Sequence, residues 1–141
     1  MEFDVNDADQ VKELYQDCLV AIKKSYSPYS HNRVGACIWT RDGKKFYGAN
    51  IENAAYGLTI CAERTAMFNA HLHDVKKEDQ IVIGIAADFK GYAWPCGSCR
   101  QVMVELLPLD CPVVVFNREG KEVHFAVKDS MVGVFTKDDL A

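Results

Sequence analysis

The feature that most constrains the fold is a pair of cysteine motifs, each at the start of a predicted helix. The first motif is Cys61-Ala62-Glu63 and the second is Pro95-Cys96-Gly97-Ser98-Cys99. A Cys-x-x-Cys at a helix N-terminus brings two thiols to one side of a turn, where exposed N–H groups favour the thiolates. Cys61 opens its helix under the same conditions. We therefore expect a fold in which two helix N-termini meet and three thiolates converge on one cation.

Three cysteine ligands predict a catalytic zinc site. Catalytic zinc has three protein ligands and leaves its fourth position to water, whereas structural zinc is closed by four. Glu63 follows Cys61 by two residues, so its carboxylate is expected to face the open position and to move protons there. A Glu after the first ligand, followed by Pro-Cys-x-x-Cys, is typical of zinc-dependent deaminases, here in the form with three Cys ligands.

Two other interpretations of the cysteines stay open at this point. One is a structural zinc, which needs a fourth Cys or His, and the other is a thiol–disulfide pair. His71 and His73 are two residues apart and lie about three turns beyond Cys61 on the predicted helix, which excludes them from its site. The spacing does not exclude His31 or His124.

Two arginines stand directly beside the motifs. Three thiolates around Zn²⁺ leave a net negative charge, which weakens the metal as a Lewis acid. A guanidinium that donates to a thiolate sulfur withdraws some of that charge. We predict this role for Arg64, which follows Glu63. For Arg100, which follows Cys99, this role and that of an ordinary surface arginine are equally open.

Hydrophobic periodicity predicts an α/β fold. Strands separated by helices imply crossover connections and some parallel pairing. We expect one mixed sheet of about five strands with helices on both faces, and a hairpin turn at residues 41–44, where Asp-Gly tolerates a tight turn. The predicted helices are 8–24, 61–72 and 98–107, and the predicted strands are 34–40, 45–51, 81–87, 113–116 and 122–127.

The composition excludes several classes of protein. With 141 residues, the chain is expected to form a single domain over 1–141. Its net charge of −4 argues against a strongly basic nucleic-acid-binding protein. No apolar run approaches the roughly 20 residues that cross a bilayer, and the N-terminus lacks a secretory signal, so we expect a cytoplasmic protein with no membrane partner. In that compartment thiols stay reduced, and the remaining cysteines, Cys18, Cys37 and Cys111, are expected to be buried free thiols.

Taken together, the motifs of this sequence resemble those of a known family. The sequence resembles the small, homotetrameric type of cytidine deaminase over nearly the whole chain, with the order and spacing of the motifs intact. The resemblance implies a three-layer α/β/α sandwich, Zn²⁺ as cofactor, and a homotetramer whose active sites draw on neighbouring subunits. The motifs that carry it are Tyr26-Ser27-Pro28-Tyr29-Ser30, Val34-Gly35-Ala36, Asn50-Ile51-Glu52-Asn53-Ala54-Ala55-Tyr56, Cys61-Ala62-Glu63-Arg64-Thr65-Ala66 and Pro95-Cys96-Gly97-Ser98-Cys99-Arg100-Gln101.

The same resemblance implies a set of substrate contacts. Asn50 and Glu52 would hold the ribose hydroxyls, which agrees with the donors and acceptors that an amide and a carboxylate offer. Ala62 would also contact the substrate. The contacts implied to be lent to an adjacent subunit's site are Ala55, Tyr56 and Phe135.

Two positions depart from the family pattern. Asn32 stands where the family usually has a Phe that packs on the pyrimidine ring, and stacking on an aromatic is worth roughly 1–3 kcal/mol. Tyr29 or Phe135 could compensate. Ser130-Met131-Val132 replaces a Leu-Leu-Pro. We expect both changes to border the base pocket, and the hypothesis that follows is a pocket altered for a modified or bulkier cytosine nucleoside.

The implied reaction is hydrolytic deamination of cytidine or deoxycytidine to uridine or deoxyuridine plus ammonia, by zinc-bound hydroxide, as in pyrimidine salvage. Glu63 would pass protons to ring N3 and to the departing amine. Three alternatives stay open. The first is a deaminase of a modified cytosine nucleoside or of a blasticidin-like aminopyrimidine antibiotic. The second is a nucleic-acid editing deaminase, although such enzymes usually have His in place of Cys61 and a basic channel. The third is a catalytically silent zinc-binding oligomer, which would have no chemical need for Glu63.

Overall fold

The computed structural model describes residues 1–140, which form an alternating series of helices and strands. The α-helices are α1 (Ala8–Ile22), α2 (Ala62–Leu72) and α3 (Gly97–Leu106). The strands are β1 (Val34–Thr40), β2 (Lys45–Ala49), β3 (Gln80–Ala87), β4 (Pro112–Phe116) and β5 (Glu122–Ala126). Each predicted element is present, with ends that differ from the prediction by a few residues at most.

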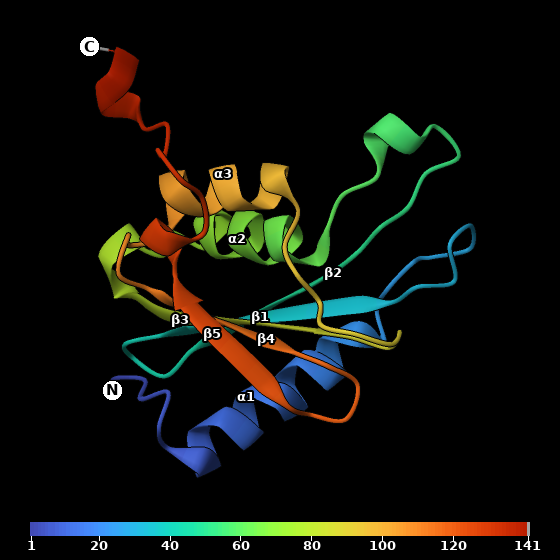
Figure 1. Ribbon diagram of the computed structural model, residues 1–141, viewed down its shortest axis with the longest axis horizontal. Helices are drawn as coiled ribbons and strands as arrows, with labels where there is room; N and C mark the ends of the chain where they lie inside the picture. The colour runs from blue at the N-terminus through green and yellow to red at the C-terminus, as the bar shows by residue number, and fades with distance from the viewer. Residues whose placement is uncertain (141) are drawn as a thin grey trace.

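The strands of residues 1–140 form one mixed sheet in the order β2-β1-β3-β4-β5. β3 pairs in parallel with β4, and the other neighbours are antiparallel. The parallel pair requires a crossover, which α3 supplies. Helix α1 covers one face of the sheet, and α2 and α3 cover the other (Figure 1). The predicted three-layer α/β/α sandwich is therefore confirmed. Within residues 1–140, no helix is both long and apolar enough to cross a membrane.

The core has two parts, one on each face of the sheet. On the α1 face, Leu14 and Cys18 pack against Trp39 and Phe116. Asp17 is buried there, where its carboxylate accepts hydrogen bonds from Trp39 Nε1 at 2.8 Å and from Lys45 Nζ at 2.9 Å. On the other face, α2 and α3 pack on the sheet through a larger apolar cluster. This second part of the core holds the N-termini of α2 and α3 at the same edge of the sheet.

The predicted buried free thiols are confirmed. Cys18, Cys37 and Cys111 are all buried and form no disulfide within residues 1–140. Burial raises the pKa of Cys37 and that of Cys111 to about 12. These thiols stay protonated at neutral pH and act as small apolar side chains.

Two glycines allow helices to lie directly on the sheet. A Cβ on Gly48 of β2 would lie 2.3 Å from the backbone nitrogen of Ala66, on α2. A Cβ on Gly35 of β1 would lie 2.3 Å from the carbonyl oxygen of Cys18 and 2.6 Å from the nitrogen of Ile22, on α1. Because both neighbours are backbone, a side chain at either position forces a helix away from the sheet.

We predict that Gly35→Ala lowers the free energy of unfolding by about 3 kcal/mol or more, because the added methyl overlaps helix backbone that cannot move alone. Gly57→Ala is the matched control, since a Cβ on Gly57 meets nothing within 4 Å. Urea unfolding of the two variants measures the difference. Equal stability of the two would show that α1 can shift without loss of packing.

Candidate active site

The three cysteines of the two motifs lie together at the N-termini of α2 and α3. Cys61 is the N-cap residue of α2, Cys96 is the N-cap residue of α3, and Cys99 lies in the first turn of α3. Their sulfurs all lie within 4.8 Å of one another. Neither N-cap cysteine uses its side chain to cap its helix. The thiols are therefore available for another purpose.

The geometry of the cluster fits a zinc ion. Tetrahedral ligands at the Zn–S distance of ~2.3 Å lie roughly 3.8 Å apart. The sulfurs of Cys61 and Cys96 are 3.8 Å apart, and those of Cys96 and Cys99 are 3.4 Å apart. Thiolates are ligands that zinc prefers. The cluster thus has both the spacing and the donor atoms of a three-cysteine zinc site.

Hydrogen bonds within the cluster favour the thiolate form of Cys61. A hydrogen bond from the Cys99 thiol lowers the pKa of Cys61 to about 5, and a hydrogen bond from Arg64 acts in the same direction. The same sulfur–sulfur contact raises the pKa of Cys99. Arg64 Nη2 donates to Cys61 Sγ at 3.4 Å, while its buried Nε has no hydrogen-bond partner within residues 1–140. Arg64 therefore places its positive charge directly against the sulfur of Cys61.

Removal of that charge should weaken metal binding. We predict that Arg64→Gln lowers zinc affinity and kcat by roughly 10- to 100-fold, the range typical of groups that hydrogen-bond to metal ligands. Competition with a chromogenic chelator measures the affinity. Arg118→Gln serves as the control, because Arg118 is an exposed arginine that pairs with its neighbour Glu119. Unchanged zinc affinity in Arg64→Gln would contradict this role.

Arg100 does not contact the sulfurs. Its Nε donates to the carbonyl oxygen of Pro95 at 2.8 Å, and its Nη1 donates to the carbonyl oxygen of Ser130 at 2.7 Å. Its guanidinium also lies over the ring of Phe125. Of the two interpretations that the sequence left open, neither is accurate. Arg100 fixes the loop before α3 to the segment after β5.

Glu63 lies in the first turn of α2 beside the sulfur cluster, with only 4% of its surface exposed. Burial raises the pKa of Glu63 to about 7, and the negative charge of Cys61 acts in the same direction. A carboxyl group that titrates near neutral pH can both accept and donate a proton under working conditions. This is the property required of a general acid and base.

A pocket of about 170 Å³ opens onto the cluster. Cys61, Ala62 and Glu63 line it from the start of α2, and Asn50 lines it from the end of β2. Two aromatic side chains complete it from the loop between β3 and α3, namely Phe89 and Trp94. The pocket therefore brings together Cys61 and Cys96, a buried carboxyl group and an aromatic surface in one small space.

Asn50 and Glu52 organise the loop at residues 25–34. Asn50 Oδ1 accepts a hydrogen bond from the backbone N–H of Val34 at 2.9 Å, and its Nδ2 donates to the carbonyl oxygen of Asn32 at 2.9 Å. Glu52 accepts from the N–H of Tyr29 at 3.0 Å and from both the N–H and the hydroxyl of Ser30. The hydrogen bond from the Ser30 hydroxyl holds the pKa of Glu52 below its usual value. Asn50 lines the pocket, whereas Glu52 is not among the residues that line it.

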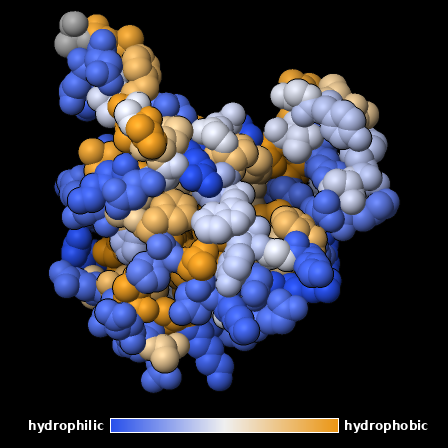
Figure 2. Space-filling model, viewed as in Figure 1, coloured by the Kyte–Doolittle hydropathy of each residue, from blue (hydrophilic) through white to orange (hydrophobic). Residues whose placement is uncertain are grey.

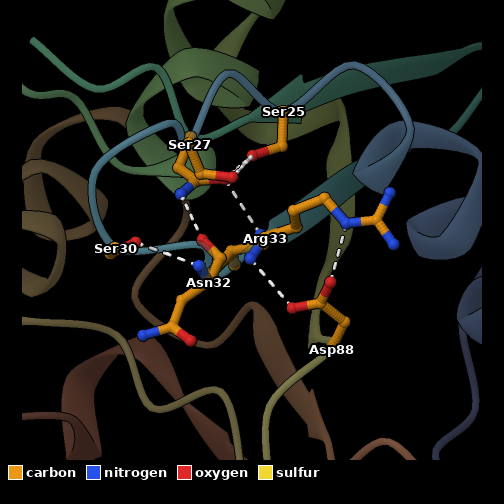
Figure 3. Close-up of polar contacts among 8 residues, drawn as sticks. Ser25, Ser27, Ser30, Asn32, Arg33 and Asp88 are labelled. Atoms are coloured by element: carbon orange, nitrogen blue, oxygen red, sulfur yellow. Dashed lines mark hydrogen bonds and ion pairs between the residues drawn. The ribbon is translucent and has the colours of Figure 1, made fainter.

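The positions that depart from the family pattern lie outside this pocket. The Asn32 side chain is exposed and points away from the contacts of Ser25 and Ser27 (Figure 3). Ser130 is buried behind α3, where its carbonyl oxygen binds Arg100, and Val132 is fully exposed. Neither Asn32 nor residues 130–132 belong to the lining. The expectation that they border the pocket is not met in this chain.

The residues expected to serve an adjacent subunit lie on two segments that extend from the body of the protein. Ala55 and Tyr56 lie between β2 and α2, and Tyr56 is 76% exposed. Phe135 lies near the C-terminus, where its carbonyl oxygen accepts a hydrogen bond from Gln101 at 2.8 Å. Both segments project away from the sheet (Figure 1), and both carry apolar side chains at their surface (Figure 2).

Sequence reasoning missed Phe89 and Trp94. A weak signal was present, because ligands of α/β proteins often bind at the carboxyl ends of strands, and both residues follow β3. Trp94 also stands two residues before Cys96. Nothing in the periodicity distinguishes an aromatic residue that lines a pocket from one in the core.

Comparison with known families agrees with this geometry. Residues 8–115 match the family described as the cytidine and deoxycytidylate deaminase zinc-binding region. The chain is 43% identical over 127 residues to a cytidine deaminase of Halalkalibacterium halodurans, and the aligned region covers 90% of this chain and 95% of the relative. It is 39% identical over 134 residues to a probable cytidine deaminase of Dictyostelium discoideum, covering 92% of this chain and 88% of that relative.

Solved structures give the same result. The fold is similar to the crystal structure of cytidine deaminase from Burkholderia pseudomallei, with a TM-score of 0.85 and 40% sequence identity over 88% of this chain and 98% of that one. It is also similar to cytidine deaminase from Mycobacterium tuberculosis, with a TM-score of 0.76 and 26% identity over 94% of this chain and 99% of that one.

Proposed function

This chain belongs to the family of zinc-binding cytidine and deoxycytidylate deaminases, and we propose that it converts cytidine and deoxycytidine to uridine and deoxyuridine with release of ammonia, a reaction of pyrimidine salvage. The observation that carries the proposal is a pocket whose wall contains the buried Glu63 together with Cys61 and Cys96, two members of the three-thiol cluster. Neither a redox dithiol nor a closed structural zinc site requires a buried carboxyl group at that point.

The residues of the pocket divide the chemistry between them. Cys61, Cys96 and Cys99 would hold the zinc, which when bound supplies a Lewis acid that makes water nucleophilic near neutral pH. Glu63 takes a proton from the attacking water and passes it to ring N3, which makes C4 electrophilic. Glu63 then takes the second water proton and delivers it to the amine that leaves C4. One water is consumed, and one ammonia is released for each uracil nucleoside formed.

Asn50 and Glu52 are suited to bind the ribose. Within residues 1–140, Asn50 Nδ2 uses one N–H of its two, and the Glu52 carboxylate accepts three hydrogen bonds of the roughly four that it can accept. One donor and one acceptor therefore remain for the sugar hydroxyls. Ala62 is assigned to the substrate because it lines the same pocket.

The proposal includes a homotetramer with shared active sites. The exposed Ala55 and Tyr56, and the partly exposed Phe135, would reach the site of a neighbouring subunit. Large apolar side chains gathered on projecting segments favour such an interface. Because three free thiols are required as ligands, a reducing compartment, the cytoplasm, is the proposed location.

The direct test is turnover by purified protein of known zinc content. We expect cytidine and deoxycytidine to lose absorbance as uracil nucleosides form, with stoichiometric ammonia. A modified cytosine nucleoside or a blasticidin-like compound is not favoured, because the matched relatives named above are cytidine deaminases. Absence of ammonia from both nucleosides with fully zinc-loaded protein would refute the proposal.

A further inference from the structure

The loop between β3 and α3 carries aromatic side chains into the pocket. Phe89 and Trp94 both line the pocket, on the same loop as the ligand Cys96. Phe89 is half-buried and packs against the core that supports α2 and α3. Trp94 is 54% exposed, which is unusual for so large an apolar ring. An exposed indole at the rim of a pocket has a free surface that a planar ligand can cover.

Other aromatic rings hold Trp94 in place. Its ring lies 6.3 Å from that of Phe125 with an angle of 24° between their planes, and 5.9 Å from that of Tyr92. The backbone N–H of Trp94 also donates to the carbonyl oxygen of Tyr92. Contact with two rings and a tight turn restricts the indole, so a ligand that stacks on it loses little energy in ordering the side chain.

Both ends of the loop are anchored. Asp88 accepts hydrogen bonds from the N–H of Arg33 at 2.9 Å and from its Nε at 2.7 Å (Figure 3), and its own N–H donates to the Arg33 carbonyl oxygen. At the other end, Arg100 binds the carbonyl oxygen of Pro95. The loop is thereby fixed against the segment next to Asn50 on one side and against the sulfur cluster on the other.

We propose that Phe89 and Trp94 form the aromatic wall on which the pyrimidine ring of the substrate lies, with Trp94 as the main determinant of base affinity. This inference rests on the proposed function and names the residues that select for a planar base within it. Asn32 is not among the residues that line the pocket, so the loop after β3 supplies the stacking surface from a different part of the sheet. Every pyrimidine has a π-face, and stacking on an indole needs no further polar contact.

Steady-state kinetics separate this role from a structural one. Trp94→Ala is expected to raise the KM for cytidine roughly tenfold and to leave kcat within about threefold, because stacking supports binding more than proton transfer. Phe89→Ala should act in the same direction. Trp94→Phe keeps a ring and should restore KM to near the wild-type value. Phe68→Ala is the control, since Phe68 is a partly exposed aromatic residue of α2 outside the pocket.

Fluorescence provides a readout that a structural role would not change. Trp39 and Trp94 are the only tryptophans of the chain, and Trp39 is 1% exposed in the core. Uridine is the probe, because it carries the product base and is not turned over. Saturating uridine should change the emission of the wild type and leave that of Trp94→Phe unchanged.

The outcomes distinguish the two proposals. If wild-type protein releases ammonia from cytidine but Trp94→Ala has an unchanged KM and uridine does not change the emission, the aromatic wall is wrong and the proposed function stands. If zinc-loaded wild type releases no ammonia and uridine leaves its emission unchanged, both are wrong. A tenfold rise in the KM of Trp94→Ala with normal zinc content, together with a KM near the wild-type value for Trp94→Phe, supports the aromatic wall.

Discussion

Glu63→Gln is expected to lower kcat by about 10³-fold while the protein keeps its fold and its zinc. General acid–base groups contribute roughly 10²- to 10⁴-fold, and here one carboxyl group serves two successive proton transfers. Glu63 is 4% exposed, and burial raises its pKa to about 7, so its carboxyl group can both accept and donate a proton near neutral pH. Glutamine keeps the shape of the side chain but cannot carry a proton between water, ring and amine.

The control for this variant is Glu105→Gln, which makes the same chemical change at an exposed position of α3. It should retain wild-type kcat. Rates are measured with zinc content determined for each preparation. If Glu63→Gln with one zinc per chain retains more than about a tenth of wild-type kcat, the assigned proton transfers are wrong.

Cys99→Ala is expected to abolish stable zinc binding and, with it, turnover. The Cys99 side chain is fully buried, and its sulfur lies 3.4 Å from that of Cys96. Two remaining cysteine ligands do not make up the three protein ligands that catalytic zinc requires. Zinc content should fall from about one ion per chain to a small fraction. Chelators are expected to lower the stability of the wild type and to leave that of the variant unchanged.

Cys111→Ala is the matched control, because Cys111 is also a buried thiol and lies outside the cluster. It should keep full zinc content and turnover, with a stability cost of about 1 kcal/mol from the small cavity. Metal analysis after dialysis decides between the two residues. Equal zinc content in the two variants would show that Cys99 is not a ligand.

Much of this fold could be predicted, because its signals are local. The Asp-Gly turn and the apolar run of β3 each determine their own elements. The ends of elements depend on distant partners and were less accurate. The strand predicted over 45–51 ends at Ala49, because the carbonyl oxygen of Asn50 accepts from the N–H of Tyr26 and leaves the hairpin. No spacing within the strand encodes that bond.

The sulfur cluster was predictable for the same reason, whereas the pocket was not. Cys-x-x-Cys and Cys-x-Glu place their side chains through a single helical turn each. Arg64 follows from the same turn. The arrangement of Arg100, however, depends on Ser130, and the aromatic side of the pocket depends on how the loop after β3 packs against Phe125. Such contacts join segments far apart in sequence, and one sequence alone does not reveal them.

Deamination of cytidine in water enriched in ¹⁸O, followed by mass spectrometry of the product and a parallel assay of ammonia, tests hydrolysis at this site directly. Wild-type protein is expected to give uridine that carries one ¹⁸O at C4, with one ammonia for each uridine, and Glu63→Gln is expected to give neither product. Unlabelled uridine, or no uridine from protein with one zinc per chain, would contradict hydrolysis at this site.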